Sequence, residues 1–482
     1  MPLIIGATAA TATASLIPNS CRWNPSDTPK LERTFGAGGD IKTYTISVWF
    51  KRCGIGANQV ILQAYGASDS YVAGLKLTSG DQLQFDVWDN GDTCTLKTDR
   101  VLRDVSAWYH CVIAFDSTNT SAKMWINGVL QTSWASETQP SLNADGLFNT
   151  SGFYYVIGMH RGGGSQFDGY IADPILIDAT AYDNTDFGEF DTDSPGIWKP
   201  IDVSGLTFGT QGAFLNFADS ADLGNDVSGN GNDLTNTNLV AADQSQDSPV
   251  NNFCTLNSEN LPTSNAPAFT QGNTYVVTPN AGSAYFGGTT TIGLSSGKWY
   301  WETYSVSALA AAVVGVYTDP NDAALNNRQP GYSTYDWAYE YDGTIISGNV
   351  DQDTGMGSWT SGDYIGTYLD LDNLKIYWAK DGVIINSGTG WTITAASLIA
   401  PYSSPGAYFP GCADQETTSS TFAYNFGNGA FGDTVLTGTT YADADGYGIF
   451  KYSPNDGGSA SFDSSAKDFM AICTKNLAAY GG

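Results

Sequence analysis

The feature that most constrains this chain is a three-strand pattern that occurs twice. Residues 108–133 read WYHCVIAFDSTNTSAKMWINGVLQTS, and residues 363–387 read DYIGTYLDLDNLKIYWAKDGVIINS. Each run contains a strand, a polar turn, a second strand with a Trp near its end, a tight turn and a third strand. The tight turns are Asn-Gly at 127–128 and Asp-Gly at 381–382, pairs that tolerate the positive φ angles of a type I′ hairpin. The repeat predicts two domains of related β architecture.

Alternation of apolar and polar residues is the dominant pattern elsewhere in the chain. Residues 44–50 and 82–88 alternate with a period of two and are rich in β-branched and aromatic residues, which is typical of strands. Residues 335–341 place Tyr or Trp at every second position, and we expect that face to pack into a sandwich core. No amphipathic helical pattern of 12 or more residues occurs, so the sequence predicts an all-β chain of sandwiches.

Length and charge exclude several classes of protein. The 482 residues are enough for two or three domains. With 20 Lys+Arg and 49 Asp+Glu the net charge is −29, which argues against nucleic-acid and anionic-membrane partners, because both need a basic face. The seven cysteines are odd in number and scattered, without a CxxC pair. We therefore expect free thiols, with neither a disulfide framework nor a zinc cluster.

Composition also divides the chain. Residues 205–265 are rich in Asn, Asp, Gly and Ser and poor in apolar residues, and we interpret them as a connector with one or two short strands. This predicts an N-terminal arm at 1–20, a first sandwich at 21–204, the connector, and a second sandwich with a C-terminal tail at 266–482. Because the arm is small, apolar and uncharged, we expect it to become ordered against another subunit or a larger particle.

Motifs in both halves resemble known families. In the first, the segments YTISVWFKR (44–52), WYHCVIAFD (108–116), MWINGV (124–129) and FDGYIADPILIDATAYD (167–183) resemble the laminin-G-like, concanavalin-type jelly roll. In the second, GKWYWETYSV (297–306), VVGVYTD (313–319), GDYIGTYLDLDNLKIYWAKDG (362–382), PYSSPGAYFPGC (401–412) and FAYNFGNGAF (422–431) resemble SPRY domains. The first resemblance implies carbohydrate binding on a concave sheet. The second implies protein binding through loops at one end of a β-sandwich, without enzymatic activity.

The pairing of these modules with SGNGNDLT (228–235) and the ending FMAICTKNLAAYGG (469–482) resembles structural proteins of tailed bacteriophages. That resemblance implies a non-enzymatic tail-fibre or receptor-binding protein on the virion surface, synthesised in the host cytoplasm. Its partners would be a host-surface glycan or protein and other virion subunits, and by analogy with phage fibres it would form a homotrimer. Two alternatives remain open: a capsid-decorating or tail structural protein that binds other virion subunits, and a glycan depolymerase.

No catalytic residues are expected. Concanavalin-type glucanases carry an E-x-D-x-(x)-E motif, and the nearest string here is EFDTD at 189–193. It ends in Asp rather than Glu and lies between Gly188 and a Ser-Pro pair, where a loop is favoured over a rigid strand. The two histidines, His110 and His160, have no Ser or Cys signature around them, so we expect structural roles.

No metal or other cofactor is expected either. If a Ca²⁺ ion binds, Asp168 and Asp173 of the FDGYIAD segment are the expected ligands, although hairpin-turn roles are favoured for both.

The segment 318–335 is the predicted contact loop. It lies between two strand signals and is too long for a tight turn. Asn327 and Arg328 offer a planar amide and a guanidinium for hydrogen bonds to sugar hydroxyls or to backbone, and Tyr332 and Tyr335 add rings beside them. We therefore predict that these four residues contact the partner.

Overall fold

The computed structural model describes residues 16–481 except 263, 281, 283, 308–310, 322–326, 400–405, 416–417 and 456–467. The described residues form two compact units: the N-terminal unit ends at Val250 and the C-terminal unit begins at Asn251. Both consist mainly of antiparallel strands, and the single α-helix in the described part of the chain is α1 (Thr474–Tyr480). The predicted all-β fold is confirmed. No helix among these residues is long and apolar enough to cross a membrane.

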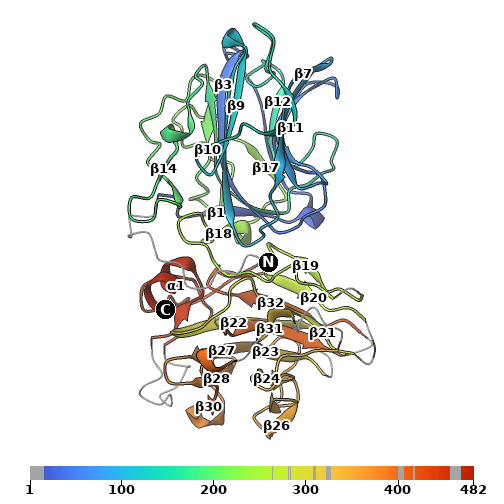
Figure 1. The fold of residues 1–482 in the computed structure, drawn as a ribbon, viewed down its shortest axis with the longest axis vertical. Coiled ribbons are helices and arrows are strands. Elements are labelled where there is room, and N and C mark those ends of the chain that lie inside the picture. The colour runs from blue at the N-terminus through green and yellow to red at the C-terminus, as the bar shows by residue number, and fades with distance from the viewer. Residues whose placement is uncertain are drawn as a thin grey trace. The chain divides into compact units, whose positions relative to one another are not determined.

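Two eight-stranded sheets form the N-terminal unit, and the core lies between them (Figure 1). The first sheet has the order β10 (Val129–Leu130), β9 (Ser121–Ile126), β8 (Trp108–Asp116), β3 (Thr43–Arg52), β13 (Gly169–Asp178), β1 (Ser20–Trp23) and β18 (Gln244–Ser245), with β16 (Ala213–Phe214) paired to β13. The second sheet has the order β11 (Trp134–Thr138), β7 (Asp92–Val101), β6 (Gln82–Asp89), β5 (Tyr71–Leu77), β4 (Gln59–Tyr65), β12 (Tyr154–Ile157), β2 (Lys30–Thr34) and β17 (Thr235–Thr237). A separate hairpin joins β14 (Gly188–Phe190) to β15 (Trp198–Pro200).

The C-terminal unit also contains two large sheets. The third sheet has the order β19 (Ala268–Thr270), β20 (Tyr275–Val277), β32 (Thr421–Asn425), β22 (Lys298–Ser307), β27 (Tyr364–Asp370), β28 (Lys375–Lys380) and β29 (Val383–Ile384), with β30 (Trp391–Thr392) on β28 and β35 (Met470–Ala471) on β22. The fourth sheet has the order β21 (Phe286–Thr289), β31 (Phe409–Asp414), β23 (Val313–Tyr317), β24 (Trp337–Glu340), β25 (Ile345–Ser347) and β26 (Val350–Asp353). A further hairpin joins β33 (Ala430–Phe431) to β34 (Thr434–Val435).

Short 3₁₀ turns occur in both units, at Pro25–Asp27, Ser117–Asn119, Asn184–Asp186, Ala241–Asp243, Asn386–Gly388 and Ala396–Leu398.

The repeated meander has the predicted structure in both units. Strands β8, β9 and β10 form one copy, and β27, β28 and β29 form the other. The tight turns have φ angles of 47° and 75° at Asn127 and Gly128, and of 48° and 76° at Asp381 and Gly382. Positive φ at both central positions defines a type I′ turn, which matches the right-handed twist of the flanking strands.

The segment predicted as a connector is instead divided between the two units. Within 205–250, β16 pairs with β13, β17 with β2 and β18 with β1, so this part completes the sheets of the N-terminal unit. The SGNGNDLT loop is fixed by Asp226, whose carboxylate accepts hydrogen bonds from the backbone of Phe214, Ser228 and Asn232. Strands of two or three residues are too short to show alternation, which is why composition alone suggested a connector.

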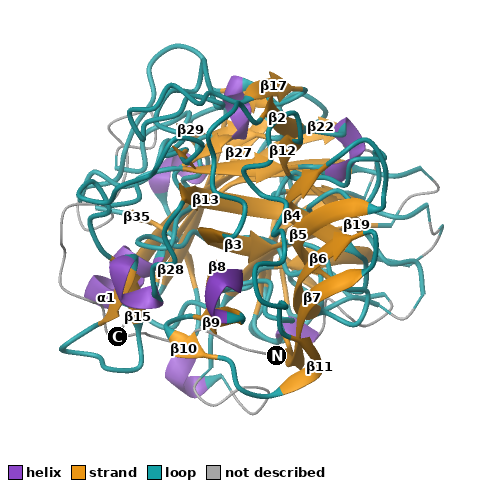
Figure 2. Ribbon diagram, turned by 90° about the horizontal axis from the view of Figure 1, so that it is seen from above, coloured by secondary structure: helices purple, strands orange, loops and turns teal. Residues whose placement is uncertain are grey.

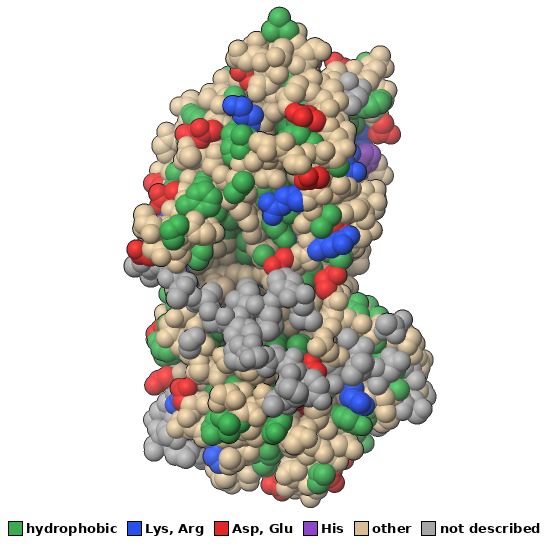
Figure 3. Space-filling model, in the orientation of Figure 1, with side chains coloured by type: hydrophobic (Ala, Val, Ile, Leu, Met, Phe, Trp, Pro, Cys, Tyr) green, Lys and Arg blue, Asp and Glu red, His purple; other side chains and the backbone are tan. Residues whose placement is uncertain are grey.

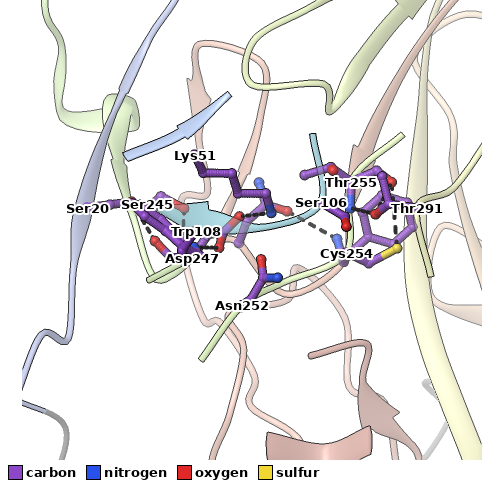
Figure 4. A network of polar contacts seen from close by, with 12 residues as sticks. Ser20, Lys51, Ser106, Trp108, Ser245, Asp247, Asn252, Cys254, Thr255 and Thr291 are labelled. Carbon is purple, nitrogen blue, oxygen red and sulfur yellow. Dashed lines mark hydrogen bonds and ion pairs between the residues drawn. The ribbon is translucent and has the colours of Figure 1, made fainter. Parts of the chain in front are cut away.

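A buried ion pair holds the end of this segment to the first sheet. Lys51 Nζ on β3 lies 2.8 Å from Asp247 Oδ2, and neither side chain is exposed. The indole N–H of Trp108 donates to Asp247 Oδ1 at 3.0 Å, and the Ser20 hydroxyl donates to the Asp247 carbonyl at 2.5 Å. Figure 4 shows these groups converging on Asp247. Because a buried charge needs both a counter-ion and hydrogen bonds, the whole set acts as a unit.

A second buried carboxylate organises the C-terminal unit. Glu302 on β22 accepts hydrogen bonds from the backbone N–H of Lys451 at 3.0 Å and of Tyr452 at 2.7 Å. The side-chain amide of Asn425 and the phenol of Tyr300 also donate to it, at 2.9 and 3.0 Å. Burial raises the pKa of Glu302 to about 7, and the hydrogen bonds oppose that increase only in part.

We expect the C-terminal unit to become less stable as the pH rises from about 4.5 to 7. Burial raises the pKa of Glu302 and of Glu340 to about 7. In that window the folded chain binds more protons than the unfolded chain, so the free energy of unfolding falls with pH. Thermal unfolding measured between pH 4.5 and 8 should show the melting temperature decreasing, with a shallower slope in Glu302→Gln. A melting temperature that increases over this window would contradict the expectation.

The predictions for the N-terminal arm and for the cysteines can be compared with the structure. Of the predicted arm at 1–20, residues 1–15 lie outside the described residues. All seven cysteines are buried free thiols.

Trp125 and Trp378, which precede the two tight turns, lie in hydrophobic clusters, at 8% and 0% exposure. The alternating aromatic residues at 335–341 also pack against the C-terminal core, as the period of two predicted.

Candidate functional site

The structure brings together three of the four residues predicted in the contact loop. The Arg328 guanidinium carbon lies 4.2 Å from the ring centroid of Tyr332, within cation–π range. Asn327 exchanges hydrogen bonds with the backbone of Tyr285, at 3.0 and 3.2 Å. Tyr335, in contrast, is half-buried and packs against the core cluster of the C-terminal unit. A partner contact at these residues stays a prediction.

The two aspartates predicted as Ca²⁺ ligands lie in different environments. Asp173 is part of β13, and Asp168 immediately precedes that strand. Asp168 is half-buried, and burial raises its pKa to about 6. Asp173 is 7% exposed with a φ of 43°, and burial raises its pKa well above the usual value. Within the described ranges, no group of three or more His, Cys, Asp or Glu side chains is placed to hold a metal ion.

A buried Ser–His pair in the N-terminal unit resembles part of a catalytic dyad but has the wrong proton arrangement. His110 Nε2 lies 2.8 Å from the Ser47 hydroxyl, and the indole N–H of Trp198 donates to His110 Nδ1 at 2.9 Å. Because Nδ1 accepts, the neutral ring carries its proton on Nε2 and donates it to Ser47. A general base needs a free lone pair at that position. Burial also lowers the pKa of His110 to about 3.

The acidic EFDTD string is engaged in local contacts. Lys199 forms ion pairs with Glu189 and Asp191, each at 3.3 Å. Asp191 also accepts hydrogen bonds from the backbone N–H groups of Asp193 and Ser194, which closes a turn. Glu189 and Phe190 therefore belong to strand β14, contrary to the predicted loop, and only residues 191–193 lie in the turn that the flanking Ser-Pro indicated.

A hollow on the outer face of the second sheet is the site with the most suitable chemistry. The adjacent strands β4, β5 and β6 run side by side (Figure 2). Leu75 on β5 and Phe85 on β6 point into the core, so Gly74 and Asp86 lie on the opposite, outer face. The hollow is lined by Val60, Gln63, Val72, Gly74, Leu75, Lys76, Asp86 and His160.

Strand register creates this hollow. Gln63, Gly74 and Asp86 are directly opposite one another on the three strands. A glycine in the middle of that row has no side chain, while both of its neighbours have long or charged ones. The floor at this point is therefore backbone, with Gln63 forming one wall and Asp86 the other.

Polar groups around the hollow include both donors and acceptors. Lys76 Nζ forms an ion pair with Asp86 at 3.1 Å. Only 3% of the surface of Gln63 is exposed. Its amide oxygen accepts a hydrogen bond from the backbone N–H of Arg161, and its amide nitrogen makes no hydrogen bond within the described ranges. His160 Nδ1 accepts from the Gly162 backbone, which leaves Nε2 as the donor of the neutral ring.

An aromatic row lies next to the hollow. Tyr65, Val72 and Trp88 are directly opposite one another, one step along the strands from the Gly74 row. Trp88 is 45% exposed, a large value for the largest apolar side chain. On the other side of Tyr65, the ring of Tyr154 stacks on it with centroids 5.0 Å apart. Val72, which lines the hollow, is thus flanked by an indole and a phenol ring.

Sequence reasoning did not identify this site. Outward-facing polar residues are expected on any half-exposed strand, so Gln63, Lys76 and Asp86 carry no local signal. The glycine inside a strand pattern at position 74, and the exposed Trp at position 88, were the two available indications. The face in Figure 3 shows Lys and Arg side chains of the described residues scattered among neutral atoms, in line with the absence of a predicted basic patch.

Comparison with known proteins gives one family match and several structural similarities. Residues 34–179 match the model of the concanavalin A-like lectin/glucanases superfamily, Laminin_G_3. No curated protein sequence matches the chain.

Three solved structures illustrate the structural similarities. The SPRY domain of human HERC1 is 19% identical, covers 31% of this chain and 87% of its own, and has a TM-score of 0.24. A SAP-like pentraxin from Limulus polyphemus is 13% identical over 36% of this chain and 80% of its own, with a TM-score of 0.28. A putative carbohydrate binding protein from Bacteroides ovatus is 15% identical over 46% of this chain and 58% of its own, with a TM-score of 0.29.

Proposed function

We propose that this protein binds glycans without catalysing a reaction on them, and that the hollow on the second sheet is the binding site. The observation that carries the proposal is the row of Gln63, Gly74 and Asp86, which combines a backbone floor with polar walls. The match of residues 34–179 to a lectin/glucanase superfamily model supports it.

The chemistry of the hollow suits a sugar ring. Each sugar hydroxyl both donates and accepts hydrogen bonds, and here Asp86 accepts while Lys76, Gln63 and His160 donate. The C–H groups of the ring suit an aromatic or aliphatic surface, which Val72 and the neighbouring Trp88 provide. A concave site that combines apolar side chains with a few convergent polar groups is typical of small-ligand recognition.

The proposal of binding without catalysis is supported by the contacts of the carboxylates and of the histidine that a hydrolase would use, because those contacts engage the groups elsewhere. The EFDTD carboxylates are held by Lys199 and by backbone, and the Ser47–His110 pair has the unproductive tautomer. Incubation with a bound oligosaccharide should release no reducing sugar. Release above the rate of the uncatalysed reaction would favour the depolymerase alternative.

Within this function, we place the protein on the surface of a tailed-phage virion, as a homotrimeric tail-fibre or receptor-binding component that recognises a host-surface glycan or protein. The motif resemblances in both halves and the net charge of −29, which disfavours nucleic-acid contact, support that role. Locating the chain in a cryo-EM map of the particle tests it. Density on the capsid or along the tail tube would instead favour the decorating or tail structural role.

Replacing the exposed indole should weaken binding with little effect on folding. In Trp88→Ala we expect the affinity for glycans that bind the wild type to fall by about tenfold or more, since aromatic contacts dominate small recognition surfaces. A glycan array followed by titration of the strongest ligand measures the effect. The matched control is Tyr441→Ala, which removes a ring of 40% exposure in the C-terminal unit. Equal affinities of the Trp88 variant and the wild type would contradict the proposed site.

A further inference from the structure

We infer that the hollow binds the terminal residue of a glycan chain, and that this residue is a neutral hexopyranose held through two neighbouring hydroxyl groups. The inference rests on the proposed function and specifies its ligand. Three features of the hollow lead to it: its short extent along β5, its closed end and the balance of its charges.

The short extent of the hollow suits one sugar residue. The space lies along β5, where Val72, Gly74 and Lys76 are the successive outward positions. An extended polysaccharide would need an open groove over several such positions.

One end of the hollow is closed. Lys76 is opposite Gln84, one step beyond the Gly74 row, but its ammonium group reaches back to Asp86 in that row. The lysine stem and the ion pair therefore bound the hollow at this end. His160, in the loop that follows β12, lines it from the β4 side. At the other end Val72 lies between Tyr65 and Trp88, so the rest of a chain can leave past the two rings.

The charges select a neutral sugar. The positive charge of Lys76 and the negative charge of Asp86 cancel, and Gln63 adds an uncharged hydrogen-bond donor. A carboxylate-bearing sugar would meet the Asp86 carboxylate at the same site. An acceptor and a donor 3.1 Å apart match two neighbouring hydroxyls, one donating to Asp86 and the other accepting from Lys76. Hydrogen bonds to charged groups are the stronger kind, which gives this pair the main role in specificity.

The test uses methyl glycosides of glucose, galactose and mannose as competitors against an array-bound oligosaccharide. We expect at least one neutral glycoside to compete and its uronic acid analogue to compete at least about tenfold less well. Of the 2-, 3-, 4- and 6-deoxy analogues of that glycoside, two that lack hydroxyls at adjacent positions should bind with an affinity lower by about tenfold or more. Asp86→Asn should reduce this difference in affinity between positions, while Trp88→Ala should lower the affinity for all analogues by the same factor. Asp351→Asn, at an exposed carboxylate on β26, is the matched control.

The outcomes separate this inference from the proposed function. If array glycans bind and depend on Trp88 but no methyl glycoside competes, or if capping the terminal residue with a further sugar leaves affinity unchanged, the terminal-residue inference is wrong and glycan binding stands. Equal loss at all deoxy positions would overturn the two-hydroxyl contact. If no array glycan binds the wild type, the proposed function and the inference both fail.

Discussion

Asp247→Ala is expected to lower the free energy of unfolding of the N-terminal unit by about 3–5 kcal/mol, because it leaves the Lys51 ammonium buried without its counter-ion. The change also removes the acceptor of the Trp108 indole N–H. For a unit of this size, each kcal/mol corresponds to roughly 2–4 °C in melting temperature, so the transition should shift down by about 10 °C. Differential scanning calorimetry measures the shift.

Two variants make this result interpretable. Asp69→Ala removes an ion pair to Arg161 in which the Asp69 side chain is 78% exposed, and such surface pairs contribute about 1 kcal/mol or less. The double variant Lys51→Met with Asp247→Leu replaces the buried charges by apolar groups and should recover most of the loss. A single-variant loss below about 1 kcal/mol would show that the ion pair does not hold the 205–250 segment in place.

Glu302→Ala is expected to destabilise the C-terminal unit by about 3–5 kcal/mol. It removes the acceptor of four hydrogen bonds, two of them from the Lys451 and Tyr452 backbone, and leaves the Asn425 amide and the Tyr300 phenol buried. Unsatisfied buried donors and the cavity both add to the cost. Calorimetry measures the stability loss, and hydrogen exchange should show reduced protection of the Lys451 and Tyr452 amides.

The comparison with Glu302→Gln separates charge from shape. The amide keeps the volume of the carboxyl group but replaces one acceptor oxygen by a donor, so we expect a smaller loss than in Glu302→Ala. Asp351→Ala, at an exposed position on β26, serves as the control for removing an acidic side chain. Unchanged protection of the two amides in Glu302→Ala would contradict the role assigned to the carboxylate.

The sequence by itself determined the class of fold and much of its local structure. Alternation with a period of two predicted β3, β6 and β8, because one face of each strand is buried against the opposite sheet. The Asn-Gly and Asp-Gly pairs predicted the two type I′ turns, because positive φ is a local preference of those residues. Properties that depend only on neighbouring residues in the sequence can thus be predicted from the sequence.

Only the tertiary structure decided which side chains meet. Lys51 and Asp247 are 196 positions apart in sequence, and the composition of the segment that carries Asp247 predicts a connector. Gln63, Gly74 and Asp86 form one row only because β4, β5 and β6 pair in a particular register, and a shift of one strand by one residue would turn its member of the row toward the core. Register depends on how both sheets bury their apolar faces together, a property of the whole unit that no local pattern encodes.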